Sequence, residues 1–102
     1  AVLKSIGHSL YEEMLYDEKG AALERDLVDY HIFRADEMPD LSTLFIQTFE
    51  PSHPFGVKAV AEIPLDGVAP AVGNAVLDAC GANVDINPVT PERVWLAMQK
   101  KE

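Results

Sequence analysis

The stretch Val68-Ala-Pro-Ala-Val-Gly-Asn-Ala-Val-Leu-Asp-Ala-Cys80-Gly81 decides the fold that this sequence predicts. Its apolar residues recur at helical spacing, and Pro70 suits the first turn of a helix because its missing N–H has no partner there. Gly81 suits the left-handed residue that ends a helix. We therefore predict a helix over residues 68–80, whose many small side chains can pack closely on a sheet.

Two further helices are predicted on either side of this one. Near residues 1–10 the apolar side chains are spaced by three and four, which indicates a helix. They are Leu3, Ile6, Leu10 and Met14. Thr90-Pro91-Glu92 is a strong helix start, because Thr can cap the first turn, Pro fits the first position and the acid lies near the positive end of the dipole. We predict a helix over residues 91–100.

The remaining segments predict extended structure. Residues 41–49 are rich in Thr, Ile and Phe, with apolar groups on both faces, which is typical of a central strand. Residues 11–17 and 21–25 can pair as antiparallel strands across the polar turn between them. Residues 26–39 show no clear period and indicate an irregular connection. The expected fold is therefore α+β, a single small domain with a mixed short sheet and about three helices.

The charge balance excludes several classes of partner. The 102 residues include 17 acids and 8 Lys or Arg, which gives a net charge of −9 with neutral histidines. Nucleic acids and anionic membrane surfaces are bound through cationic side chains, so we expect neither. Apolar runs fall short of the roughly 18 residues that a membrane span requires.

The beginning of the chain predicts its location and its context. Residues 1–5 lack the basic-then-apolar order of a signal peptide, and we expect a cytoplasmic protein. The sequence begins without Met, inside an apolar periodic pattern. We expect it to be a piece of a larger protein.

Few residues offer chemistry by their spacing. His8, His31 and His53 lie far apart in the sequence and do not show the spacing of a metal site. The single cysteine, Cys80, excludes an internal disulfide framework and a cysteine-built zinc site. Its place at the end of the predicted helix indicates a buried, inert thiol.

Glu62 is the exception, because it lies inside the apolar run Val60-Ala-Glu-Ile-Pro-Leu65. A carboxylate that is buried among apolar groups is destabilised and becomes a stronger base. Simple alternation along a strand would instead point the same side chain at solvent. The residues alone leave both interpretations open.

Four blocks of this sequence, in order, resemble the end of the molybdenum-cofactor subunit of the xanthine dehydrogenase and aldehyde oxidase family. The blocks are residues 56–65, 68–76, 78–81 and 88–94. Two looser matches precede them, Gly7-His-Ser-Leu-Tyr-Glu-Glu13 and Asp29-Tyr-His-Ile32. The resemblance covers nearly all of the chain and implies that residues 1–102 are a C-terminal segment of a molybdopterin-binding domain.

The resemblance also implies a role for Glu62. Proteins of this family hydroxylate a carbon of an N-heterocycle or an aldehyde with oxygen from water, and Glu62 corresponds to their catalytic general base. Ala59, Val60 and Ala61, directly before it, are the residues expected to contact the cofactor. The sequence departs from the family here, because Ala59 and Ala61 replace two glycines and Ile63 replaces a proline.

The cofactors and partners are implied in the same way. The complete enzyme is expected to carry a molybdenum–pterin cofactor, with iron–sulfur clusters and FAD on other domains or subunits. Its partners are the remainder of the molybdenum subunit, the iron–sulfur and flavin parts, and a small N-heterocyclic or aldehyde substrate. The 102 residues alone are expected to bind none of these cofactors and to be inactive. The replaced glycines favour an alternative, a non-catalytic interaction module with the family fold.

Overall fold

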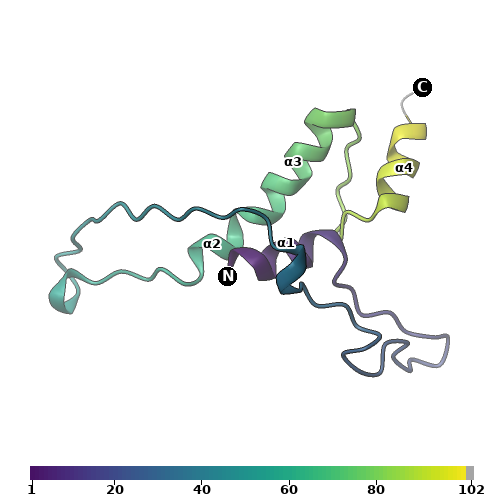
Figure 1. Ribbon diagram of the computed structural model, residues 1–102, viewed down its shortest axis with the longest axis horizontal. Coiled ribbons are helices and arrows are strands. Elements are labelled where there is room, and N and C mark those ends of the chain that lie inside the picture. Colours follow the sequence, from purple (N-terminus) through teal and green to yellow (C-terminus); the bar gives the residue numbers. More distant parts are fainter. Residues whose placement is uncertain (101–102) are drawn as a thin grey trace.

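The structure is a computed structural model that describes residues 1–100, and α-helices form its framework (Figure 1). The α-helices are α1 (Val2–Leu10), α2 (Ile63–Asp66), α3 (Val68–Cys80) and α4 (Pro91–Gln99), with short 3-10 turns η1 (Ala35–Glu37) and η2 (Pro54–Gly56). The helices predicted near residues 1–10, 68–80 and 91–100 are therefore confirmed. Helix α1 packs against both α2 and α3.

The ends of α3 and α4 follow the sequence signals. Gly81 adopts a left-handed conformation with φ of 67°, and its N–H donates to the Leu77 carbonyl at 2.7 Å. Thr90 lies before α4, and its hydroxyl accepts from the backbone N–H of Arg93 at 3.3 Å. The cap and the proline that follows it place the start of α4 at Pro91.

An Asp-Gly pair favours a turn, but Asp66 and Gly67 are helical instead. Asp66 is the last residue of α2, and Gly67 has right-handed helical angles (φ −81°, ψ −18°). Gly67 already accepts the first bond of the next helix, from the N–H of Ala71 at 3.2 Å. One residue therefore separates α2 from α3, and the two form a nearly continuous unit.

The expected sheet is not supported, because the structure assigns no strand within residues 1–100. Residues 41–49 are not assigned to a strand, and no ladder pairs them with another segment. Residues 11–17 and 21–25 do return antiparallel, but they form a single bridge between Tyr16 and Ala22. A strand is stabilised by a neighbour that takes up its N–H and C=O groups, and the described chain offers none to residues 41–49.

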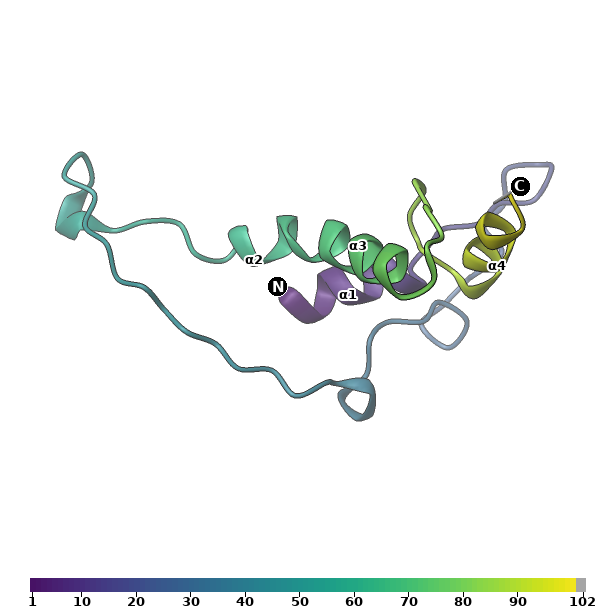
Figure 2. The same cartoon turned by 90° about the horizontal axis from the view of Figure 1, so that it is seen from above.

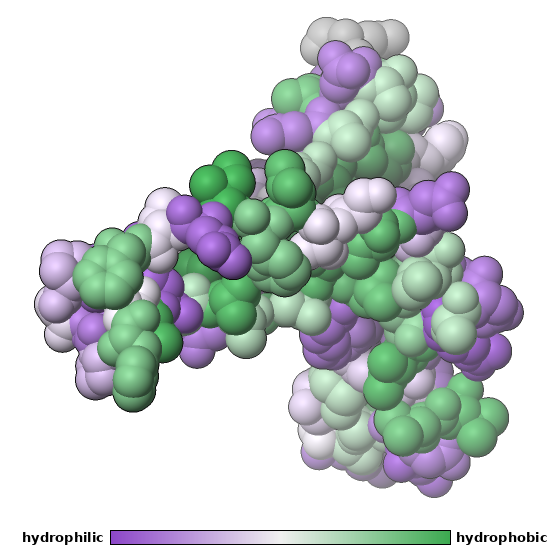
Figure 3. Space-filling model, turned by 60° about the vertical axis from the view of Figure 1, so that its left-hand side comes forward, coloured by the Kyte–Doolittle hydropathy of each residue, from purple (hydrophilic) through white to green (hydrophobic). Residues whose placement is uncertain are grey.

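The molecule is open. Residues 38–62 form an arm that leaves the helices, turns back at η2 and returns to α2 (Figures 1 and 2). The radius of gyration is 17.7 Å, whereas a compact domain of this length would have about 13 Å. Among the described apolar side chains only Ala82, Pro88 and Val89 are buried, and apolar residues reach the surface across the face shown in Figure 3.

None of the helices within residues 1–100 combines the length and the apolar character that crossing a membrane would require.

Candidate functional site

Glu62 lies where the arm returns to the helices. It is the residue before α2, and its backbone carbonyl accepts from the N–H of Leu65 at 2.8 Å. Its side chain is exposed, and within residues 1–100 its carboxylate has neither a hydrogen-bond donor nor an ion-pair partner. The flanking Val60 and Ile63 are 58% and 65% exposed. The described residues therefore present Glu62 openly and do not enclose it among apolar groups.

The backbone next to Glu62 is held more firmly than its side chain. Ser5 of α1, which is 2% exposed, donates its hydroxyl to the Leu65 carbonyl at 2.7 Å. The carbonyls in the last turn of a helix have no partner within that helix, so this bond satisfies a group that α2 cannot satisfy itself. Ser9, one turn further along α1, is fully buried and donates to the Ser5 carbonyl at 2.5 Å. Glu62 thus stands at the start of an anchored helical turn.

The three residues expected to contact a cofactor lead into this turn. Ala59, Val60 and Ala61 are all exposed. None of the backbone N–H groups of residues 58–61 donates a hydrogen bond within the described part of the chain. Methyl side chains leave the backbone accessible, so this strip can offer donors and acceptors to a polar group lying along it. The neighbouring cation, Lys58, donates to the Thr48 hydroxyl at 2.6 Å across the arm.

The tip of the arm is a tight turn. The N–H of Glu50 donates to the Gly56 carbonyl at 3.2 Å, and the hydroxyl and N–H of Ser52 lower the pKa of the Glu50 carboxyl. Gly56 has φ of 68°, and a Cβ there would lie 2.1 Å from the Phe49 ring. The glycine is therefore required for the turn by its conformation and by its contact with Phe49.

A buried acid lies on the opposite side of α1. A run of acidic residues in a predicted strand favours a solvated edge, but Glu12 is only 5% exposed. It pairs with Lys4 and accepts from the Tyr30 hydroxyl at 3.3 Å, while its Oε1 atom has no hydrogen-bond partner. Partial burial, and then the Glu12 carboxylate, raise the pKa of Tyr30. The signal for this burial was Gly7, which leaves room for Glu12 beside the helix.

The three histidines and the cysteine have different surroundings. His8 and His53 are exposed, and His31 bonds Glu37 at 2.8 Å. Cys80 is half-buried and donates to the Val76 carbonyl at 3.2 Å. Within residues 1–100, no group of three or more His, Cys, Asp or Glu side chains could hold a metal ion.

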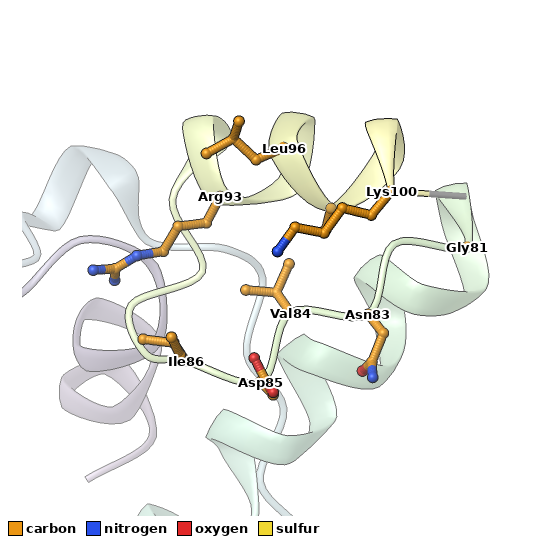
Figure 4. Close-up of a pocket in the computed structure, with 9 residues that line it drawn as sticks. Gly81, Asn83, Val84, Asp85, Ile86, Arg93, Leu96 and Lys100 are labelled. Atoms are coloured by element: carbon orange, nitrogen blue, oxygen red, sulfur yellow. The ribbon is translucent and has the colours of Figure 1, made fainter. Parts of the chain in front are cut away.

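A hollow of about 410 Å³ lies between α4 and the segment that follows α3 (Figure 4). Its lining includes Asp85, Arg93 and Lys100, but the Arg93 guanidinium turns away to the Pro88 carbonyl and to Glu13, each at 2.8 Å. The hollow begins at Gly81, beyond the end of α3, so the 13 residues of that helix, about 20 Å of rise, separate it from Glu62. It therefore does not belong to the Glu62 site.

Comparison with known proteins gives consistent similarities over nearly the whole chain, although no family model matches it. The chain is 38% identical over 101 residues to "Probable hypoxanthine oxidase XdhD" of Escherichia coli (strain K12), covering 98% of this chain and 11% of that protein. It is 36% identical over 91 residues to "Putative xanthine dehydrogenase molybdenum-binding subunit XdhA" of the same organism, covering 88% of this chain and 12% of that one.

The fold comparison agrees. The chain superposes on part of the quinoline 2-oxidoreductase of Pseudomonas putida 86 with a TM-score of 0.86 and 30% sequence identity, covering 99% of this chain and 13% of that chain. The chain thus spans between 11% and 13% of the length of these proteins. The helices and the arm therefore have an arrangement similar to that of a part of a much larger protein.

Proposed function

Because the chain belongs, as a segment, to the family of xanthine dehydrogenase-type molybdenum-binding subunits, we propose that Glu62 is the catalytic base of a molybdenum hydroxylase that contains it. The proposed reaction places a water-derived oxygen on a carbon of a small substrate. An N-heterocycle is the favoured class, since the names of two of the similar proteins refer to hypoxanthine and quinoline. Further domains or subunits with iron–sulfur clusters and flavin are the proposed electron acceptors.

The observation that carries the proposal is the state of Glu62. Its carboxylate is exposed and unpaired within residues 1–100, while its backbone is anchored to α1 through Leu65. A general base must have a free lone pair and a fixed position relative to the atom that loses its proton. Two acids beside α1 are already engaged, because Glu12 pairs with Lys4 and Glu13 with Arg93.

The residues around Glu62 fit one wall of a cofactor site. The open backbone of Ala59–Ala61 would lie along the molybdenum–pterin group, with the Glu62 carboxylate beyond it. When bound, that group supplies the two-electron oxidation of the substrate carbon. Glu62 accepts a proton at a carboxylate oxygen from the attacking oxygen nucleophile. The apolar Val60 and Ile63 flank that carboxylate and would exclude water once other residues cover them, which makes the base stronger.

The test is Glu62→Gln in the complete enzyme, because the substitution keeps the size of the side chain and removes the proton acceptor. Loss of a general base lowers the rate by about 100-fold to 10,000-fold. Molybdenum content should remain near that of the parent, since the side chain is isosteric. Turnover and metal should be measured on the same preparation.

Asp66→Asn is the matched control, since Asp66 is also an exposed acid and lies at the other end of α2. Its rate should stay within a factor of a few of the parent. A fully metallated Glu62→Gln enzyme with normal turnover would refute the assignment of Glu62 as the base. A metallated parent protein without turnover would instead favour the interaction-module alternative, to which the replaced glycines at Ala59 and Ala61 point.

A further inference from the structure

A buried serine hydroxyl of α1, that of Ser5, donates to a backbone carbonyl of α2. We propose that Ser5 is a positioning residue for Glu62, acting through the Leu65 carbonyl. This inference rests on the proposed function of Glu62. It assigns a role to a residue far from Glu62 in the sequence, in a different helix.

The hydrogen bond from Ser5 to Leu65 stabilises α2 from outside that helix. Helix α2 has four residues, which is too short for a helix to be stable by itself. The arm before it makes few hydrogen bonds, and within residues 1–100 the Ser5 hydroxyl makes the one side-chain hydrogen bond between α1 and the segment 62–67. Since the Leu65 N–H in turn donates to the Glu62 carbonyl, a shift of Leu65 moves the backbone of Glu62.

Burial makes the bond difficult to replace. Ser5 is 2% exposed, so water cannot easily take the place of a deleted hydroxyl. In Ser5→Ala the Leu65 carbonyl loses its donor while α1 itself is preserved, because Ala is the best helix former. The expected result is a looser turn at residues 62–66 and an imprecisely placed base.

Ser9 provides a matched control within the same helix. It is also a buried serine, and its hydroxyl bonds the Ser5 backbone carbonyl, so its hydrogen bond stays within α1. Ser9→Ala therefore removes the same atom from the same kind of environment without removing the donor to Leu65. A general loss of packing in α1 would affect both variants alike, whereas a positioning role affects Ser5→Ala alone.

The experiment uses the complete enzyme with both serine variants, Glu62→Gln, and the double variant Ser5→Ala/Glu62→Gln. We expect Ser5→Ala to lower kcat about 10-fold to 100-fold, as a small misplacement of a catalytic group does, with KM within a factor of three and unchanged molybdenum content. Amide hydrogen exchange over residues 62–67 should be faster in Ser5→Ala and unchanged in Ser9→Ala. In the Glu62→Gln background, Ser5→Ala should cost no further rate, because it acts through Glu62.

The outcomes separate the two proposals. Unchanged exchange over residues 62–67 in Ser5→Ala, equal effects of the two serine variants, or a fully additive double variant would overturn the positioning role. A metallated Glu62→Gln enzyme with normal turnover would instead overturn the proposed function, whatever the exchange of Ser5→Ala shows.

Discussion

Two glycines inside helices are expected to respond to alanine in opposite directions. Gly7 lies within α1 and Gly73 within α3. In a helix interior, replacing Gly with Ala gains about 0.8–1 kcal/mol because the backbone of the unfolded chain is less free. On propensity alone, both substitutions would stabilise the protein by the same amount.

The surroundings of Gly7 reverse this expectation. A Cβ at Gly7 would lie 2.6 Å from Oε1 of Glu12, whereas nothing lies within 4 Å of a Cβ at Gly73. Glu12 is buried, pairs with Lys4 and accepts from Tyr30, so its carboxylate cannot withdraw freely. Overpacking costs about 1–3 kcal/mol, and a weakened hydrogen bond to a charged group about 1.5–3 kcal/mol. After the propensity gain, Gly7→Ala should lose about 1.5–5 kcal/mol.

The assay is amide hydrogen exchange over α1 and α3 in the complete enzyme, because the chain alone leaves most of its apolar side chains exposed. Since 1.4 kcal/mol is a tenfold change in an equilibrium constant, exchange over α3 should be about fivefold slower in Gly73→Ala, and exchange over α1 should be faster in Gly7→Ala. A Gly7→Ala chain as stable as the parent would refute the close contact with Glu12. A destabilising effect of Gly73→Ala would show that another part of the protein lies against α3 at Gly73.

Two further predictions concern a helix cap and a titration. Thr90→Ala should destabilise α4 by about 0.5–1 kcal/mol, at the low end for an N-cap because the bond to Arg93 is 3.3 Å long. Amide hydrogen exchange over α4 in the complete enzyme should therefore be faster in Thr90→Ala and unchanged in the exposed control Thr43→Ala. The pKa of Glu37 lies below its ordinary value because the backbone N–H of Arg34 donates to its carboxylate, with a smaller effect of His31. The η1 turn should therefore be fully supported above the ordinary glutamate range and lose that support as the pH falls through the lowered pKa of Glu37. Carbon NMR titration of the Glu37 side chain tests this, and in His31→Ala the pKa should remain low.

The helices could be predicted because the signals that define them are local. Gly81 ends α3 and Thr90 begins α4 through contacts within a few residues, so the sequence near each end is sufficient. The chemistry of the helix start at Pro91 needs no distant partner. The same reasoning failed at Gly67, where a residue that favours turns continues a helix because α2 and α3 nearly join.

The lack of a strand over residues 41–49 and the burial of Glu12 could not be predicted, because both depend on distant residues. A strand over residues 41–49 requires a neighbour, and its β-branched and aromatic residues predict only that a neighbour would be favourable. Glu12 lies in a run of acids that is typical of an exposed segment. It is buried because of Lys4 and Tyr30, which are eight and eighteen residues away. The Ser5 bond to Leu65 spans sixty residues and has no signal in either local sequence.

The proposed role of Glu62 as a base and its exposure in this chain are consistent, because the chain exposes more surface than a compact protein of its mass. The accessible surface is 8345 Å², whereas a compact protein of this mass exposes roughly 5,700 Å². The excess of about 2,600 Å² is of the size that permanent assemblies bury. Part of it surrounds Glu62, since Val60 and Ile63 are more than half exposed. A dry site around the proposed base must therefore be completed by a surface that covers those two side chains, while the bond from Ser5 to Leu65 holds the backbone beside it from within the chain.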